Sequence, residues 1–446
     1  MDMQFLFGYY RILLRTMKIN KIIFVKFWLI AFAFSIPFSS FLYRLSVFFL
    51  GIILFIDFIK FIFQPFHSKI SLPPYLQSDY RFIFLPILLY LWVYLSAFWS
   101  VAPEFIVDWE VHRYFKLLMI PGLAYLLHKY NPGEQENILK AFLIGIVFLI
   151  TPSFLDGFGI FDFLGVNSEN FRNLAYSKDS YAGKNLVYHR NQIVHGFMCS
   201  ILCLSLCIYF IFNKNYKIFF IVGIFLCLID IFYLIIGRMA FIGLIAGFFA
   251  LLICYPGDLK KKSNLFLMIL SIMTFAILFS DSVQIRLFSI YNQFSNFWYS
   301  GDSTSSGGQR LHFWNISIKL FLDNPLFGAG AGAFEHYLLV TKDPLAPSAF
   351  LHAHSEYLTL LSLYGLVGFG LFAYLLMYFF KSLKTIQNSK VRCILFVSMC
   401  IFLFNALTDS SLNNEWEGWS FILFIAIVAA CSLSKLNMKN HLSTPP

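Results

Sequence analysis

The stretch FLHAHSEYLTLLSLYGLVGFG, residues 350–370, places two histidines and a glutamate directly before a long apolar run. About 20 apolar residues suffice to cross a lipid bilayer as a helix. The sequence therefore predicts a membrane span over 355–380, with His352, His354 and Glu356 at its mouth. What these three residues can do depends on the side of the membrane that the mouth faces.

The composition places the whole chain among integral membrane proteins. Apolar residues make up 59% of the 446 residues, aromatic residues 20% and charged residues only 13%. A soluble domain is close to half apolar and a quarter charged. All eight cysteines lie inside apolar runs, where neither disulfides nor thiolate metal sites are favoured. The basic N-terminal tail leads into a full-length span, so we expect no cleavable signal peptide.

Apolar runs of this kind recur along the chain and predict an all-α fold of about twelve transmembrane helices. The polar breaks NKNYK (213–217) and GDLKKKS (257–263) are the clearest turns between them. The predicted spans are 22–40, 42–63, 80–101, 112–128, 136–156, 189–212, 216–236, 238–256, 263–281, 355–380, 391–409 and 419–434.

Basic residues are distributed unequally between the two sides of the predicted membrane. With the N-terminus inside, 21 of the 33 Lys and Arg residues fall in inner segments, and acidic residues show the opposite preference. Cytoplasmic loops carry such an excess of Lys and Arg, so both termini are predicted to be cytoplasmic. The net charge of +10 follows from this pattern. No aromatic-basic module accompanies it, so we expect no nucleic-acid partner.

The longest outer segment, 282–353, separates a first group of nine predicted spans (1–281) from a region with three spans and a cytoplasmic tail (354–446). Within it, QRLHFWNISIKLFLDNP (309–325) predicts a helix that Asn324-Pro325 ends. Its apolar face, against the bundle or the membrane interface, is predicted to consist of Leu311, Trp314, Ile318, Phe321 and Leu322.

Alternating glycines follow this predicted helix in PLFGAGAGAF, at Gly328, Gly330 and Gly332. Such glycines let backbone N–H groups approach an anion, or let a loop pack tightly against helices, and the sequence leaves both interpretations open. The complete phosphate-loop motif with its Gly-Lys-Ser/Thr ending does not occur here, so we expect no nucleotide site.

Three arginines in the outer parts of the sequence are candidates for binding an anion. Arg238 lies in IIGRMAF between apolar runs, Arg286 lies in QIRLF, and Arg310 begins the predicted loop helix. Arginine presents a planar fork of donors that matches phosphate and keeps its charge. Several arginines around one outer cavity suggest a lipid-linked phosphate or pyrophosphate. For Arg238 alone, snorkelling to the membrane interface is an open alternative.

His354 is the candidate general base, because an imidazole can take a proton from a hydroxyl group. Glu356 is close enough in sequence to orient or polarise it. A metal site at His352, His354 and Glu356 is disfavoured, because residues two apart on a helix point to different faces. The carboxylate pair Asp108 and Glu110 suits either a metal or a solvated turn.

Two runs carry a family resemblance: GGQRLHFWNISIKLFLDNPLFGAGAGAF and, a short interval later, HAHSEYLTLLSLYGLVGFG. Over about 310–370 they resemble the shared region of bacterial O-antigen ligases (WaaL type), O-antigen polymerases and O-linked oligosaccharyltransferases. The resemblance implies a C-type glycosyltransferase (GT-C) fold. It also implies a donor glycan on undecaprenyl pyrophosphate at the periplasmic face of the bacterial inner membrane.

The resemblance also implies roles for individual residues. Arg238 and Arg310 would bind the pyrophosphate, joined by Arg286, whose neighbours match less well, and His354 would be the catalytic histidine. Asp409 occupies a place where the family often carries an acidic residue, and His352 lies outside the motif. In this scheme the acceptor hydroxyl attacks in line and inverts the anomeric carbon, and we expect neither a metal nor another cofactor.

The acceptor distinguishes the members of this family. The chain ends shortly after its last predicted span, whereas oligosaccharyltransferases to protein usually carry extra sequence there. Polymerases tend to divide function between two long outer loops, whereas here 282–353 is much longer than 157–188. We therefore predict an O-antigen ligase that uses lipid A-core as acceptor in lipopolysaccharide biosynthesis, with an O-antigen polymerase as the alternative.

A secondary transporter is the alternative from another class, with Asp230 and Arg238 in charge coupling. That function predicts repeats between the two halves of the chain and broken helices near the midplane. The sequence shows no convincing repeat, and its polar features gather in one outer segment.

Overall fold

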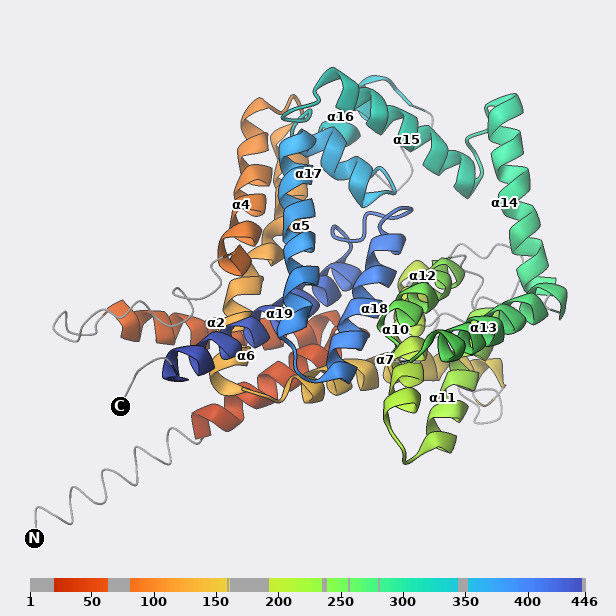
Figure 1. Cartoon of the computed structure of the whole chain (residues 1–446). Helices are drawn as coiled ribbons and strands as arrows, with labels where there is room; N and C mark the ends of the chain where they lie inside the picture. Colours follow the sequence, from red (N-terminus) through yellow and green to blue (C-terminus); the bar gives the residue numbers. More distant parts are fainter. Residues whose placement is uncertain are drawn as a thin grey trace, which may run out of the picture.

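The computed structural model describes residues 20–62, 81–158, 160, 192–234, 239–255, 257–279, 281–343 and 352–442. Every regular element within these ranges is helical, in agreement with the predicted all-α class. Residues 20–35 are helical. The elements that follow in chain order (Figure 1) are α2 (Ser40–Ile62), α4 (Arg81–Leu95), η1 (Ser96–Trp99), α5 (Glu104–Tyr114), η2 (Phe115–Leu118), α6 (Met119–Tyr130), α7 (Gln135–Gly157), α10 (Gln192–Phe212), α11 (Lys217–Ile229), η3 (Asp230–Leu234), α12 (Met239–Cys254), α13 (Leu259–Phe279), α14 (Asp281–Ser300), α15 (Ser306–Asp323), α16 (Ala333–Val340), α17 (Glu356–Ser382), η4 (Leu383–Thr385), α18 (Ser389–Asn405) and α19 (Glu415–Leu442).

Six helical segments of the described chain are long and apolar enough to cross a membrane, and each coincides with a predicted span. One shorter apolar helix, Ala240–Cys254, coincides with a seventh. The six segments are Ser40–Lys60, Arg81–Trp99, Gln135–Leu155, Gln192–Phe212, Glu356–Thr385 and Glu415–Leu433. Twelve spans and the GT-C arrangement therefore stay predictions.

The span predicted at 112–128 is broken into the end of α5, the 3₁₀ turn η2 and α6. The preceding outer segment, 99–111, is helical from Glu104 onward, so the carboxylates Asp108 and Glu110 lie on α5 rather than in a solvated turn. Asp108 is exposed and Glu110 is buried. The turn interpretation is therefore wrong, because the helix begins directly after Pro103.

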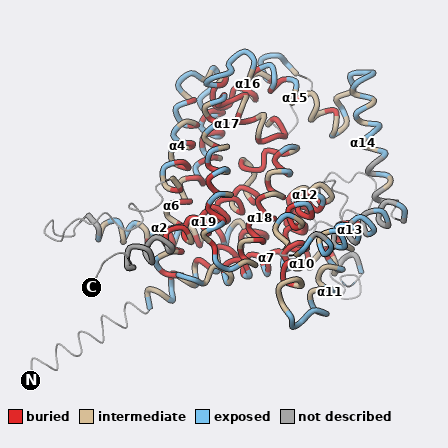
Figure 2. Tube along the Cα trace, in the orientation of Figure 1, coloured by how far each residue is buried: buried red, intermediate tan, exposed pale blue. Residues whose placement is uncertain are grey.

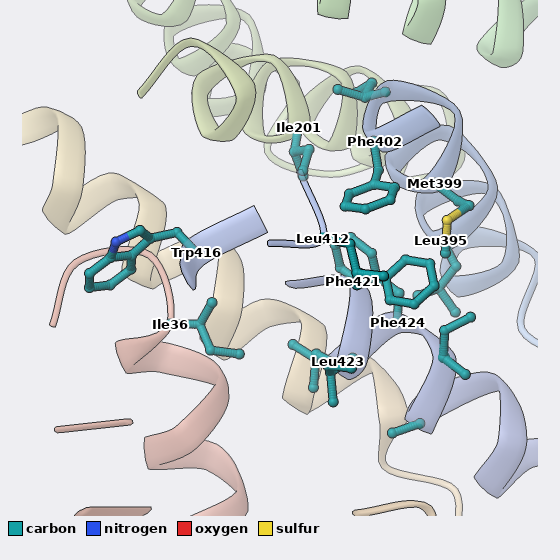
Figure 3. Close-up of a cluster of buried hydrophobic side chains, with 14 of the residues drawn as sticks. Ile36, Ile201, Leu395, Met399, Phe402, Leu412, Trp416, Phe421, Leu423 and Phe424 are labelled. Atoms are coloured by element: carbon teal, nitrogen blue, oxygen red, sulfur yellow. The ribbon is translucent and has the colours of Figure 1, made fainter. Parts of the chain in front are cut away.

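Helix α19 forms the centre of the bundle. In its most apolar window 94% of the residues are buried, compared with 22% for α2, whose apolar side chains face outward. Figure 3 shows Phe421 and Phe424 of α19 beside Phe402 and Leu395 of α18, and Figure 2 shows that burial is concentrated here. The Phe402 and Phe421 rings lie 4.9 Å apart. This core gives the surrounding helices a fixed frame.

The two ends of the bundle carry different polar clusters. At one end, Asp57 of α2 accepts hydrogen bonds from Lys21 at 2.5 Å, Lys129 at 3.0 Å and Tyr130 at 2.8 Å. We call this the Asp57 end, and it is formed by segments predicted to be cytoplasmic. At the opposite end, α15 and α16 lie across the start of α17 (Figure 1). We call this the α15 end.

The helix predicted at 309–325 is present as α15 and stops at Asn324, as expected. Its buried apolar side chains are Phe313, Ile316 and Leu320, whereas Ile318 is 44% exposed. The face that packs on α16 and α17 therefore includes Phe313, a residue that the predicted stripe leaves out. The placement of the predicted stripe at the membrane interface stays a prediction.

The glycine loop between α15 and α16 packs against α17. Gly328 has φ +77°, and a Cβ there would lie 2.3 Å from the carbonyl oxygen of Leu363. The N–H groups of Ala329 and Gly330 donate to carbonyl oxygens of α17 at 2.8 and 3.0 Å. Gly365, with φ +66°, breaks α17 where the loop approaches. The glycines therefore serve tight packing, and these N–H groups are occupied rather than open to an anion.

Candidate active site

Three segments that are distant in sequence meet at the α15 end: helix α15, residues 352–355 before α17, and the turn 406–414 between α18 and α19. Arg310 of α15 donates from Nε to the carbonyl oxygen of Thr408 at 3.2 Å. The backbone N–H of Glu356 donates to carbonyl oxygens of the same turn at 2.9 and 3.1 Å. These bonds dock the turn against the start of α17.

Residues 352–354 are not helical, which corrects the geometry predicted for the two histidines. Helix α17 begins only at Glu356, and its N-cap Ser355 accepts the N–H of Leu358 at 3.4 Å. The ring centroids of His352 and His354 lie 4.3 Å apart, with the planes tilted by 55°. The two imidazoles are therefore neighbours. The argument that they point to different faces fails because the helix starts after them.

His354 is held in a strained backbone conformation. Its φ is +48°, the left-handed region, which costs a residue with a side chain roughly 1–2 kcal/mol. Helix α15 supports it from one side. The Phe313 ring lies parallel to the imidazole, within 7° and with centroids 6.0 Å apart, and Trp314 Nε1 donates to the His354 carbonyl at 3.3 Å. Strain of this kind persists only where the surroundings hold it, and it gathers at functional sites.

Asp409 of the 406–414 turn is the carboxylate that faces the imidazole. Its Oδ1 lies 3.6 Å from His354 Nδ1. Burial raises the pKa of Asp409, but the neighbouring His354, His352 and Arg310 lower it by more, so the net shift of this pKa is downward. The group therefore stays ionised beside the imidazole. The turn fixes both oxygens through the Ser410 N–H at 2.9 Å and the Asn414 amide at 2.8 Å.

Arg310 adds a fixed positive charge to this pair. Its Nη1 donates to the carbonyl oxygen of Ser306 at 3.1 Å, and its Nε holds Thr408. Burial lowers the pKa of Arg310, and the neighbouring Asp409 raises it. A guanidinium nevertheless stays protonated in proteins. Within the described chain, its hydrogen bonds go to backbone carbonyls and not to a carboxylate.

The two other predicted arginines are not placed at the site. Arg238 lies outside the described residues, which resume at Met239. Arg286 lies on α14, and its side chain is also outside the described part. Both remain predictions for pyrophosphate binding.

Glu356 has a different place from the one predicted. Its Oε1 accepts from the Tyr114 hydroxyl at 3.0 Å, and its Oε2 accepts from the Leu412 N–H at 2.9 Å. Both oxygens therefore hold α5 and the 406–414 turn, rather than the imidazole. The predicted orienting contact falls to Asp409, because Glu356 enters the first turn of α17 and points into the bundle.

A buried polar network beneath the site contains Glu110 and also Lys116, which the sequence did not single out. Lys116 Nζ donates to the carbonyl oxygens of Asn413 and Asn414 at 3.2 and 2.8 Å. Glu110 accepts from Arg113 at 3.0 Å and from Tyr364 at 3.4 Å. The sequence does contain a signal for this network: Lys116 lies within a predicted apolar span. A charge inside such a span is stable only when it has partners.

His352 approaches the same cluster. Burial lowers the pKa of His352 to about 3. The charges of His354, Arg113 and Arg310 also lower this pKa, whereas the charge of Asp409 raises it. Single ligand atoms of His352, His354 and Asp409 all lie within 4.8 Å of one another, which matches a two-histidine, one-carboxylate metal site. The two arginines oppose a cation there. The expectation of no metal stays a prediction, to be tested by chelation.

Comparison with known proteins addresses this same region. A family model described as O-antigen ligase matches residues 223–373, which include α15, the glycine loop and the histidine pair. Residues 223–373 are therefore similar to the O-antigen ligase family. That family acts on lipid-linked polysaccharides in a membrane. Asp409 lies beyond the matched range, so its place at the site comes from the structure.

A curated relative lies in the same family. The chain is similar to the teichuronic acid biosynthesis protein TuaE of Bacillus subtilis (strain 168), with 23% identity over 211 residues. The alignment covers 45% of this chain and 42% of the relative, so the chain spans less than half the length of the protein that it matches.

Proposed function

We propose that the protein is an inner-membrane glycosyltransferase that moves O-antigen polysaccharide from undecaprenyl pyrophosphate to lipid A-core at the periplasmic face. The observation that carries this proposal is the approach of His354 Nδ1 to Asp409 Oδ1, 3.6 Å, beside Arg310. A base, its carboxylate partner and a fixed cation are the groups that glycosyl transfer from a pyrophosphate needs. Membership of the O-antigen ligase family supports the substrate class.

Each group has one role in the proposed reaction. The acceptor hydroxyl gives its proton to His354 while its oxygen attacks the anomeric carbon. The bond from that carbon to the pyrophosphate oxygen breaks, and its electron pair stays on the phosphate. Arg310, joined by Arg238 and Arg286, stabilises the charge that develops there. Asp409 stabilises the imidazolium that forms.

The reaction needs no metal ion in this scheme and inverts the anomeric carbon. Attack from the side opposite the leaving pyrophosphate gives inversion without a covalent intermediate on the protein. Incubation with EDTA should leave transfer unchanged. Loss of transfer on chelation, with recovery on adding a divalent ion, would instead make His352, His354 and Asp409 a metal site.

An O-antigen polymerase is the second candidate. The relative is named as a protein of teichuronic acid biosynthesis, which is a reason to test acceptors other than lipid A-core. The same base and cation would then act on a hydroxyl of a second lipid-linked chain.

Expression in two deficient strains separates the candidates. In a strain without its own O-antigen ligase, polymer on lipid A-core supports the ligase. Long chains restored in a polymerase-deficient strain, with polymer left on the carrier lipid in the first strain, support the polymerase. Consumption of lipid-linked glycan by purified protein without any ion gradient excludes the secondary transporter.

The proposed side of the membrane is tested by labelling. A cysteine at Thr304, before α15, should react with an impermeant maleimide in spheroplasts, and one at Lys261 on α13 should react only after lysis. Both positions are exposed. Cytoplasmic labelling at Thr304 would contradict the whole mechanism.

A further inference from the structure

A narrow cavity opens beside His352, and no step of the proposed mechanism uses it. Its polar lining comes from Glu110 of α5, Glu335 of α16, His352, and Thr359 and Ser362 of α17. The cavity has room for about one water-sized group. Neither Lys nor Arg is among the described residues that line it. The lining therefore suits a small neutral group that both donates and accepts hydrogen bonds, rather than a phosphate.

The backbone fixes which nitrogen of His352 carries the hydrogen. The His354 N–H donates to His352 Nδ1 at 3.3 Å, so Nδ1 is an acceptor. In a neutral imidazole the other nitrogen is then the donor. Burial, His354, Arg113 and Arg310 hold the pKa of His352 near 3, against the opposing charge of Asp409. His352 is therefore a neutral donor through Nε2–H across the physiological range, and not a second base.

The two carboxylates of the cavity differ in what they already bind. Glu110 accepts from Arg113 at 3.0 Å, from Asn413 at 3.3 Å and from Tyr364 at 3.4 Å. Glu335 has no hydrogen-bond partner for its side chain within the described chain. Burial and the charge of Glu110 raise the pKa of Glu335, whereas the charge of Arg113 lowers it, and the net shift is upward. Glu335 is thus the group that gains most from a donor placed in the cavity.

We propose that this cavity is a subsite for the acceptor sugar, in which one ring hydroxyl accepts a hydrogen bond from His352 and donates one to Glu335. The proposal rests on the proposed function and names where its acceptor binds. Because the His352 and His354 rings lie 4.3 Å apart, a hydroxyl held here brings a neighbouring hydroxyl of the same ring toward the base. His352 and Glu335 position the acceptor, and bond making stays with His354.

Steady-state kinetics of the purified protein in proteoliposomes test the subsite. Lipid A-core, or the lipid-linked acceptor if the strains identify a polymerase, is varied at saturating donor. The variants are His352→Ala, His352→Gln, which keeps an N–H donor, and Glu335→Gln, with His336→Ala on α16 as a control outside the cavity lining. For His352→Ala, which removes the donor, the acceptor KM should rise roughly tenfold, the effect of one lost hydrogen bond. For Glu335→Gln, which keeps an acceptor oxygen but loses the negative charge, the acceptor KM should rise several-fold.

Further readouts separate positioning from other roles. His352→Gln should recover most of the acceptor affinity, the donor KM should stay at the wild-type value, and the pH–rate profile should keep its shape. An unchanged acceptor KM in the folded His352 and Glu335 variants would overturn the proposal. Loss of the acidic limb of the pH profile in His352→Gln would make His352 a base and would also overturn it.

The test distinguishes failure of the subsite from failure of the proposed function. If His354→Ala is inactive while the cavity variants keep the wild-type acceptor KM, only the subsite is wrong. If His354→Ala transfers at the wild-type rate, the proposed chemistry itself is wrong, and the subsite falls with it. Donor binding by each variant shows that it is folded. Should His352→Ala not fold, Glu335→Gln still decides the outcome.

Discussion

The Asp57 end and the α15 end of the bundle each gather a buried carboxylate and basic groups, yet they are built differently. Asp57 is surrounded by donors: two ammonium groups, Lys21 and Lys129, and two hydroxyls, Tyr125 and Tyr130, at 2.5–3.3 Å. Each of these donors comes from a helical segment, and the cluster ties α2 to α6 and to the helical residues 20–35.

At the α15 end several side chains are held by backbone groups. Arg310 donates to carbonyl oxygens, the two imidazoles lie side by side, and His354 occupies a strained conformation. Asp409 stands at 3.6 Å from His354, longer than an ordinary hydrogen bond. We infer that the Asp57 cluster stabilises the fold, whereas the α15 cluster has the proposed role of binding a ligand and supplying a base.

Among the residues around His354, the largest effect is expected at Arg310. Arg310→Ala should lower transfer by about 10²–10³-fold, because it removes a preorganised charge from the leaving pyrophosphate. Arg310→Lys should recover little, since a point charge cannot reproduce a bidentate grip. Transfer from purified lipid-linked donor measures both. Lys319→Ala, which removes an exposed charge from the same helix, is the control, and equal losses in both variants would refute a specific role.

A smaller loss is expected at Asp409. Asp409→Asn removes the negative charge that stabilises the His354 imidazolium, worth about 1.5–3 kcal/mol or roughly ten- to a hundredfold in rate. The loss should appear in kcat at saturating donor, because Asp409 faces the base. An Asp409→Asn enzyme with wild-type kcat would show that the 3.6 Å contact is structural.

Substitution of Glu356 tests whether this residue orients the base or holds the 406–414 turn. Glu356→Gln keeps one acceptor and the size of the side chain, but weakens the bonds to Tyr114 and the Leu412 N–H. We expect transfer to fall less than in Asp409→Asn, together with a lower melting temperature of the solubilised protein. A kcat loss equal to that of Asp409→Asn, at unchanged stability, would return the orienting role to Glu356.

Substitution of Asp57 should have the smallest effect on the rate of transfer. Asp57→Asn weakens ionic hydrogen bonds to Lys21 and Lys129, with a loss of about 1–3 kcal/mol in the free energy of unfolding. Transfer per folded molecule should stay at the wild-type level. Thermal unfolding in detergent and transfer on the same sample provide the check. If transfer falls while stability holds, the division between the two ends is wrong.

Features with a strong local signature were predictable from the sequence. The apolar runs predicted the helical class, and the NP stop predicted the end of α15. The distinctive motif predicted the family of residues 223–373. What failed were contacts set by packing. The predicted face of α15 missed Phe313, which contacts both α16 and His354.

The start of α17 shows why part of the site was out of reach. Had α17 begun before His352, the two histidines would point to different faces of the helix; because it begins after them, their rings lie together. The sequence does not fix a helix boundary to within two residues. Asp409 takes the place beside His354 that was expected for Glu356, because the 406–414 turn folds back over α17, a long-range contact without a local signal. Sequence proximity to His354 was therefore a poor guide to its partner.

The central claim is that His354 acts as a base at a site where other groups bind the donor. Donor binding and transfer should be measured on the same purified His354→Ala sample. The account predicts that transfer falls by about 10²–10⁴-fold, the contribution of a general base, while affinity for the lipid-linked pyrophosphate stays at the wild-type value. If donor binding and transfer are lost together, His354 is a phosphate ligand or a structural residue, and the account is contradicted.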